Sequence, residues 1–365
     1  MSKIKVPPLP IRATSKNIQP VCYDSRVNLS RGISVVAQSS FAQLKDKLIY
    51  TVQDIFAKPK YFLVFVLARF KIFRQIYALV TRCYQSSDRG MRSDVGLAGD
   101  KTTYQAADSL FTDLDPTEVG NILKRDGVFS KFQLPQGFLQ KLLQHLEQQD
   151  CYAGGEPYLG FKISQKNLMD RVFERPFYVA RYYNISTTCP QIIQLANDPK
   201  LQEIAKGYIG RQAKYTGSSL FWTFPIEGVS QDTDQQKFRY YHYDIDDFAG
   251  LRFCFYLTDV SLEDGPHVCI RGSHLKKSVF HLLNYFSRIQ TKEELAKLYE
   301  PDKFLTITGN SGTGFAEDTF CFHKGEPPRS QPRLFLQLHF AANNYHQETY
   351  SDTRDSNTLQ SFPLA

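Results

Sequence analysis

The chain has 365 residues, 42% of them hydrophobic, and a net charge of +7, which is the composition of an ordinary globular protein. This length is enough for one large domain with an accessory region. The seven cysteines are scattered, odd in number and without a CxxC pair, which fits reduced thiols better than a disulfide framework or a cysteine-based zinc site. The N-terminus lacks the apolar segment of a secretory signal, so we expect a cytoplasmic protein with reduced thiols.

The positive charge is concentrated near the N-terminus. Residues 1–92 contain 16 Lys or Arg and four Asp, a net charge of +12, so the remaining residues carry 7 − 12 = −5. We expect residues 1–40 to be weakly structured, and residues 41–100 to form helices, broken at Lys58-Pro59-Lys60, and then a polar linker. The apolar run 61–68 is too short to span a membrane.

Three interpretations of this basic region stay open. Its helices could pack on the main domain, lie on a membrane surface as a peripheral contact, or bind an acidic partner or nucleic acid. Nucleic acid is the least favoured of these partners, because the basic residues are interleaved with apolar ones and the rest of the chain is acidic.

The remainder of the chain predicts a mainly β fold with flanking helices. Asp115-Pro116 begins a helix, residues 127–132 form a short strand, and Pro135 opens a helix with apolar side chains at helical spacing. From about residue 170 the chain turns to short β-rich segments, which suggest a barrel or a double-sheet jelly roll. These segments are 175–183, 218–225, 251–260, 267–273, 303–309, 318–324 and 333–341, with a helical insert at 280–302 and a C-terminal tail at 346–365.

A candidate metal site begins with His242 and Asp244, at the head of the predicted strand 251–260. Side chains two residues apart in a strand point to the same face, so this imidazole and this carboxylate converge. Asp246 and Asp247 are alternative carboxylates, but they lie farther along the chain.

The third ligand is sought among the other histidines. His323 ends the predicted strand 318–324 and enters a Gly/Pro-rich loop, and Arg333 opens the next strand ten residues later. His339 lies in mid-strand with no such arginine after it, and His274 fits a structural role in a turn. Two histidines and one carboxylate form the facial triad of non-haem Fe(II) oxygenases.

An arginine beyond the last histidine can bind a carboxylate through its two-pronged guanidinium group. Arg333 is the candidate for this role because it stands at a strand start. Arg329 is its competitor, although it lies within the Pro-rich loop.

Residues 112–345 resemble the phytanoyl-CoA dioxygenase family of 2-oxoglutarate-dependent Fe(II) oxygenases, whereas residues 1–100 do not. The matching elements are HYD at 242–244, LTDVSLEDGPHVCIRGSHLK with Gly265, Gly272, Ser273 and His274, and HKGEPPRSQPR with His323, Gly325 and Arg333. Arg271 stands where the family usually has proline.

This resemblance implies a double-stranded β-helix, a jelly-roll and cupin-like core, preceded here by a helical N-terminal extension. It also implies Fe(2+), 2-oxoglutarate as co-substrate and O2, with His242, Asp244 and His323 as metal ligands and catalytic residues. Arg333 would bind the far carboxylate of 2-oxoglutarate, and Lys214 is a candidate for a second polar contact. Related halogenases replace the ligand carboxylate by a small residue, so Asp244 argues against halogenation.

The expected activity is oxidation of a C–H bond in a small-molecule, lipid-like or natural-product substrate. Two alternatives of other classes stay open: a catalytically inactive barrel that serves as a binding or scaffold protein, and a nucleic-acid demethylase. The sequence selects neither the substrate nor the outcome among hydroxylation, desaturation, epimerisation and cyclisation. It does not indicate the oligomeric state.

Overall fold

The computed structural model describes residues 59–87, 109–226, 240–278, 282, 290–344 and 352–363. Residues Ala57–Ala365 form one compact unit, and residues 1–56 lie outside the described part of the chain. The expectations for residues 1–40, 41–58 and 88–100, and for residues 280, 281 and 283–289 of the insert 280–302, lie outside the described residues as well.

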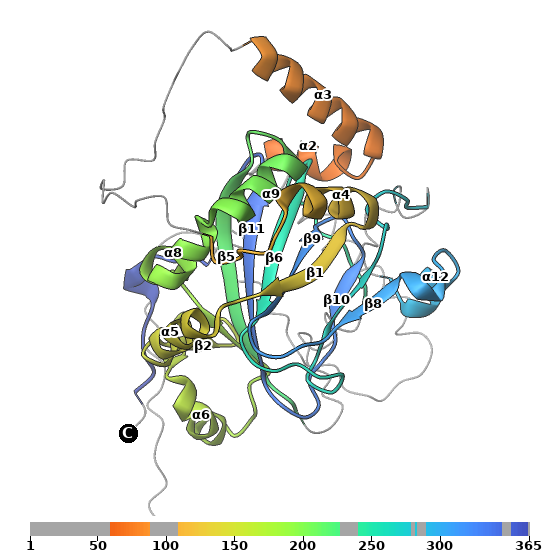
Figure 1. The fold of residues 1–365 in the computed structure, drawn as a ribbon. Coiled ribbons are helices and arrows are strands. Elements are labelled where there is room, and N and C mark those ends of the chain that lie inside the picture. The colour runs from red at the N-terminus through yellow and green to blue at the C-terminus, as the bar shows by residue number, and fades with distance from the viewer. Residues whose placement is uncertain are drawn as a thin grey trace, which may run out of the picture. The chain divides into compact units, whose positions relative to one another are not determined.

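The helices and strands follow one another as drawn in Figure 1. The helices are α2 (Pro59–Leu67), α3 (Lys71–Ser87), α4 (Pro116–Asp126), α5 (Gln136–Glu147), α6 (Lys166–Val172), α7 (Ile185–Thr188), α8 (Pro190–Ala196), α9 (Pro199–Ile209) and α12 (Lys292–Ala296). The strands are β1 (Val128–Gln133), β2 (Cys151–Ala153), β3 (Gly160–Phe161), β4 (Val179–Tyr182), β5 (Lys214–Thr223), β6 (Gly250–Tyr256), β7 (His267–Ile270), β8 (Phe304–Ile307), β9 (Thr313–Asp318), β10 (His323–Gly325) and β11 (Arg333–Ala341). Short 3-10 turns lie at Ile163–Gln165, Pro301–Lys303 and Ser356–Thr358.

The strands form two antiparallel sheets. The large sheet has the order β1-β9-β6-β11-β5-β4-β2-β3, and the small sheet has the order β10-β7-β8. An isolated bridge between His242 and His323 adds a fourth chain segment beside β10. After β5, in the large sheet, the chain reaches the small sheet at the His242 bridge and returns to the large sheet at β6. It then enters the small sheet at β7 and β8, the large sheet at β9, the small sheet at β10 and the large sheet at β11. This repeated crossing between two sheets is the jelly-roll, double-stranded β-helix topology, and it confirms the predicted fold class.

The two faces of the large sheet serve different purposes. Phe253 and Phe255 project outward into the main hydrophobic core, which includes side chains of α4, α5, α8 and α9. Tyr256, Phe315 and Phe335 project inward and pack with residues of the small sheet. Because side chains alternate along each strand, the same strands build both the supporting core and the wall of the barrel interior.

The predicted strand 318–324 is wrong. β9 ends at Asp318, and β10 begins only at His323. The Asp318 carboxylate accepts the N–H of Phe320 at 2.7 Å, and its carbonyl accepts the N–H of Cys321 at 2.9 Å, which makes a tight turn. Phe320, Cys321 and Phe322 are nevertheless fully buried, so an apolar turn imitates the pattern of a strand.

Further elements were not predicted in the segment expected to be β-rich. The α8 and α9 helices begin at Pro190 and Pro199, and the Asp198 carboxylate caps α9 by accepting the N–H groups of Lys200 and Leu201. Proline at the first helical position and an aspartate cap are ordinary helix-start signals, but the prediction gave more weight to the strand-like segments that follow. Strand β9 was also missed, since its sequence TGFAED is short and ends in two acidic residues.

The described part of the N-terminal region is helical. Pro59 is the first residue of α2, the turn to α3 lies at residues 68–70, and α3 continues to Ser87, inside the stretch expected to be a linker. Among the described residues, no helix combines the length and the apolarity that a membrane crossing requires. The cysteines whose side chains are described are all buried free thiols, as expected: Cys151, Cys189, Cys254, Cys269 and Cys321.

Candidate metal centre

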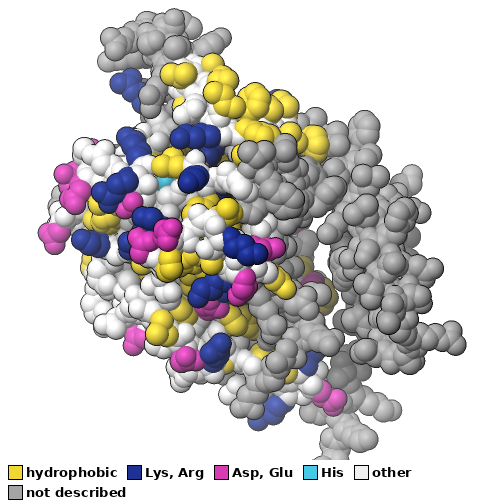
Figure 2. Space-filling view, turned by 90° about the vertical axis from the view of Figure 1, so that its right-hand side faces the viewer, with side chains coloured by type: hydrophobic (Ala, Val, Ile, Leu, Met, Phe, Trp, Pro, Cys, Tyr) yellow, Lys and Arg dark blue, Asp and Glu magenta, His cyan; other side chains and the backbone are white. Residues whose placement is uncertain are grey.

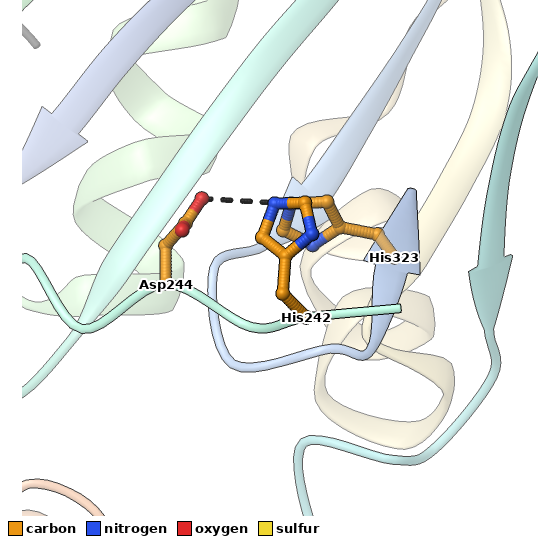
Figure 3. Close-up of side chains that lie close together, drawn as sticks. All are labelled: His242, Asp244 and His323. Carbon is orange, nitrogen blue, oxygen red and sulfur yellow. Dashed lines mark ion pairs between the residues drawn. The ribbon is translucent and has the colours of Figure 1, made fainter. Parts of the chain in front are cut away.

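The structure brings His242, Asp244 and His323 together. One ligand atom from each lies within 4.8 Å of the others, and Figure 3 shows the three side chains turned toward one another. The two histidine backbones pair directly, with N–H to carbonyl distances of 2.9 and 2.8 Å, and the ring centroids are 4.6 Å apart. The Nε2 atom of His323 is 3.5 Å from Oδ2 of Asp244.

The backbone around the triad differs from the expectation. His242 and Asp244 do not head a strand, because an irregular segment separates them from β6, which starts at Gly250. Their positions are fixed by pairing to His323 and by the N–H of Asp244, which donates to the carbonyl of Thr319 at 2.8 Å. His323 likewise begins a strand rather than ending one.

Both imidazoles are oriented for metal binding. Nδ1 of His323 is 3.0 Å from the carbonyl oxygen of Cys321, and Nδ1 of His242 is 3.3 Å from that of Tyr240. A proton on each Nδ1 donates to its carbonyl and leaves the lone pair on Nε2, which is the usual arrangement of metal-binding histidines. Two imidazole nitrogens and one carboxylate therefore fit a divalent transition metal such as Fe(II).

The competing carboxylates are engaged elsewhere. Asp246 pairs with Nη2 of Arg252 at 2.9 Å. Asp247 is buried and accepts the N–H groups of Phe248 and Asn343, each at 2.7 Å. Asp244 alone faces the two histidines, and its Oδ2 also accepts Nη1 of Arg252 at 2.5 Å.

Arg252 and a histidine–glutamate pair complete a buried polar cluster that the sequence did not reveal. Nε2 of His267 lies 2.8 Å from Oε2 of Glu317, and the same oxygen is 3.9 Å from Nδ1 of His323. Arg252 and Glu317 come from the paired strands β6 and β9 of the large sheet, and His267 comes from β7 of the small sheet. Only the packing of the two sheets against each other brings the three side chains together. The buried charges would be costly alone, and they are compensated by one another.

Charge interactions in this cluster set the protonation of the triad. Burial lowers the pKa of His242 to about 4, with a smaller contribution from His323. Burial also favours the neutral form of Asp244, but Arg252 and the two histidines together hold its pKa well below the usual value. For His323, burial is outweighed by Glu317 and Asp244, which raise its pKa. Asp244 is thus held as a carboxylate and His242 as a neutral imidazole, whereas the same carboxylates favour a proton on His323 that a bound cation would displace.

Arg333 lies in the barrel interior as the first residue of β11, with 2% of its surface exposed. Its Nη1 donates to the carbonyl of Gly265, its Nε has no hydrogen-bond partner, and no acidic side chain of the described residues forms an ion pair with it. Thr223 stands opposite Arg333 in the sheet and also buries a hydroxyl without a partner. A buried cation without a counter-charge is a strong candidate for an anion site.

The two candidate arginines lie in different surroundings. The side chain of Arg329 is exposed and lies 3.6 Å from Glu263, whereas that of Arg333 is buried in the interior.

Lys214 is not brought to this group. It is exposed and pairs with Ala341, at the opposite end of β11 from Arg333. Eight residue steps along a strand separate the two positions by about 27 Å. Lys214 and Arg333 therefore do not converge on one small molecule.

The sequence and the structure were also compared with known proteins. No protein-family model matches the sequence, and no curated protein matches it. Similar solved structures include the non-heme alpha ketoglutarate dependent epimerase SnoN from nogalamycin biosynthesis, with 13% identity over 62% of this chain and 80% of that chain and a TM-score of 0.42. EctD from S. alaskensis, solved with 2-oxoglutarate and 5-hydroxyectoine, has 17% identity over 64% and 79% and a TM-score of 0.43. At such identities and TM-scores these likenesses support no conclusion about function, which depends on the site itself.

Proposed function

We propose that this protein is an Fe(II)- and 2-oxoglutarate-dependent dioxygenase that oxidises a C–H bond of a small organic substrate, as the resemblance to the phytanoyl-CoA dioxygenase family suggests. The observation that carries the proposal is the convergence of His242, Asp244 and His323 within 4.8 Å. The buried guanidinium of Arg333 in the same barrel supports it, because it forms no ion pair with an acidic side chain of the described residues and a dicarboxylate co-substrate needs a cationic partner away from the metal.

Each residue has a defined task under this proposal. His242, Asp244 and His323 would hold the metal, and Arg333 would bind the distal carboxylate of 2-oxoglutarate. The carbonyls of Tyr240 and Cys321 keep the protons on Nδ1 of the histidines, and Arg252 fixes the carboxylate of Asp244. When bound, iron with 2-oxoglutarate and O2 supplies oxidative decarboxylation to succinate and CO2, coupled to oxidation of the substrate.

The first test is turnover without a prime substrate. Protein loaded with Fe(II) under anaerobic conditions is given 2-oxoglutarate and O2, and succinate formation and O2 uptake are followed beside a His242→Ala control. We expect slow turnover that depends on His242, and a panel of small metabolites then identifies the substrate by faster succinate release.

Other results would redirect the assignment. Iron binding without any succinate formation, even with the metabolite panel, would favour the alternative of a binding or scaffold protein. Failure to bind either Fe(II) or 2-oxoglutarate would reject the proposed function.

A further inference from the structure

The α3 helix exposes an apolar face. Ile72 and Leu79 each have 58% of their surface exposed, and Ile76 between them is also exposed. At about 100° per residue, these side chains share one side of the helix. The complete set, here named the α2–α3 face, consists of Leu63, Ile72, Phe73, Ile76, Leu79 and Val80, together with the exposed Lys60 and Lys71.

The opposite side of α3 is the one that contacts the rest of the compact unit. Arg74 donates to the carbonyl of His274 at 2.8 Å, and its guanidinium lies 4.1 Å from the ring centroid of Phe320. The Tyr77 ring stacks on Phe248 at 4.7 Å. The helix is therefore anchored by polar and aromatic contacts and directs its aliphatic residues outward, the reverse of a usual surface helix.

The charge of this segment is entirely positive. Residues 55–87 contain six Lys or Arg and no Asp or Glu. Figure 2 shows hydrophobic side chains gathered at the top of the molecule, with Lys and Arg side chains beside them. Exposed apolar side chains bordered by basic ones are typical of helices that lie in the interface of a membrane carrying anionic lipids.

We propose that the α2–α3 face docks on the surface of an anionic lipid bilayer, with the aliphatic side chains at the level of the acyl chains and Lys60 and Lys71 at the headgroups. The helices lack the length and apolarity to cross a bilayer, so this contact is peripheral. A second copy of the chain is a less suitable occupant, because a two-fold dimer would place two positively charged faces against each other. The proposal is independent of the oxygenase function.

The test uses the full chain in a vesicle flotation assay. Wild-type protein is mixed with vesicles of phosphatidylcholine alone or with 30% phosphatidylserine. We expect binding to the anionic vesicles that weakens as salt is added. The double variant Ile76→Glu/Leu79→Glu should lose at least about tenfold in vesicle affinity. The Lys60→Glu/Lys71→Glu variant should lose about fivefold for each position on anionic vesicles only.

Leu262 provides the matched control. It is 69% exposed and lies outside the α2–α3 face, so Leu262→Glu should bind vesicles as the wild type does. A milder pair, Ile72→Gln/Val80→Gln, replaces the first variant if that variant fails to give a thermal transition like the wild type. Equal vesicle binding by wild type and α2–α3 variants overturns the proposal. The proposal is also overturned if the wild type does not bind vesicles but forms a dimer in light scattering, and Ile76→Glu/Leu79→Glu dissociates that dimer. That result would assign the face to a second copy of the chain.

Discussion

The barrel interior and the α3 helix both break the usual rule that apolar side chains are buried and charged ones exposed, but in opposite ways. The interior buries Asp244, Arg252, Glu317 and Arg333, whereas α3 exposes a strip of aliphatic side chains. Each placement costs free energy in the isolated chain, since buried charges lose hydration and exposed aliphatic groups face water. Asp244 pairs with Arg252, and Glu317 pairs with His267. Arg333 forms no ion pair with an acidic side chain of the described residues. Under the two proposals made above, both departures are binding surfaces rather than contributions to stability.

The largest expected effect comes from the carboxylate of the triad. Asp244→Ala should lower 2-oxoglutarate turnover by roughly a thousandfold or more, because the metal loses a charged ligand. Asp246→Ala is the matched control, since Asp246 pairs with the same arginine but does not face the histidines. Succinate release and iron content measure both variants. Full turnover by Asp244→Ala would falsify the ligand assignment.

Replacing Arg333 separates binding from stability. Arg333→Met should weaken 2-oxoglutarate binding by about a hundredfold, because a bidentate charged contact is lost. Its thermal stability should stay the same or rise, since the variant removes a buried cation that lacks an acidic partner in the described part of the chain. Calorimetric titration and thermal unfolding measure the two effects, and the exposed Arg329→Met serves as control. A marked loss of stability in Arg333→Met would show that the guanidinium is structural.

Arg252 should act on the metal through Asp244. Arg252→Met should weaken Fe(II) or Mn(II) binding by about ten- to a hundredfold, as loss of a residue that orients a metal ligand typically does. Arg252→Lys should recover part of this loss, because one charged hydrogen bond to Oδ2 of Asp244 is retained. Metal titration followed by fluorescence or calorimetry is the measurement. Unchanged metal affinity in Arg252→Met would limit the role of Arg252 to the fold.

The smallest effects should distinguish the two sides of α3. Tyr77→Ala removes a stacked ring and the acceptor for Nδ2 of Asn343, so the free energy of unfolding should fall by about 2 kcal/mol. Its neighbour Ile76→Ser should change it by less than about 0.5 kcal/mol, because that side chain is exposed. Urea unfolding compares the two variants. Equal destabilisation would mean that the outer side of α3 contributes to the core.

Local signals in the sequence were sufficient for several elements. Asp115 caps α4 through the N–H groups of Thr117 and Glu118, as an Asp-Pro helix start predicts. The β11 strand has the predicted bounds, from Arg333 to Ala341, because its apolar run ends at turn-forming residues on both sides. The number and spacing of such short strands predicted a barrel or a double-sheet jelly roll, and the family resemblance implied the jelly roll.

Only part of the candidate site could be predicted from the sequence. The sequence by itself singled out His242, Asp244, His323 and Arg333 as candidates, because ligand chemistry and spacing are properties of the chain, and the structure brings the first three together. It placed His323 at a strand end and Lys214 near Arg333, and it overlooked Arg252, His267 and Glu317. Only the tertiary structure decided these points. Strands β6 and β9 pair in the large sheet and β7 lies in the small sheet, so the packing of the two sheets brings the three overlooked side chains into one buried cluster. The direction in which a helix such as α3 turns its apolar side likewise depends on what the other side contacts, which periodicity alone does not determine.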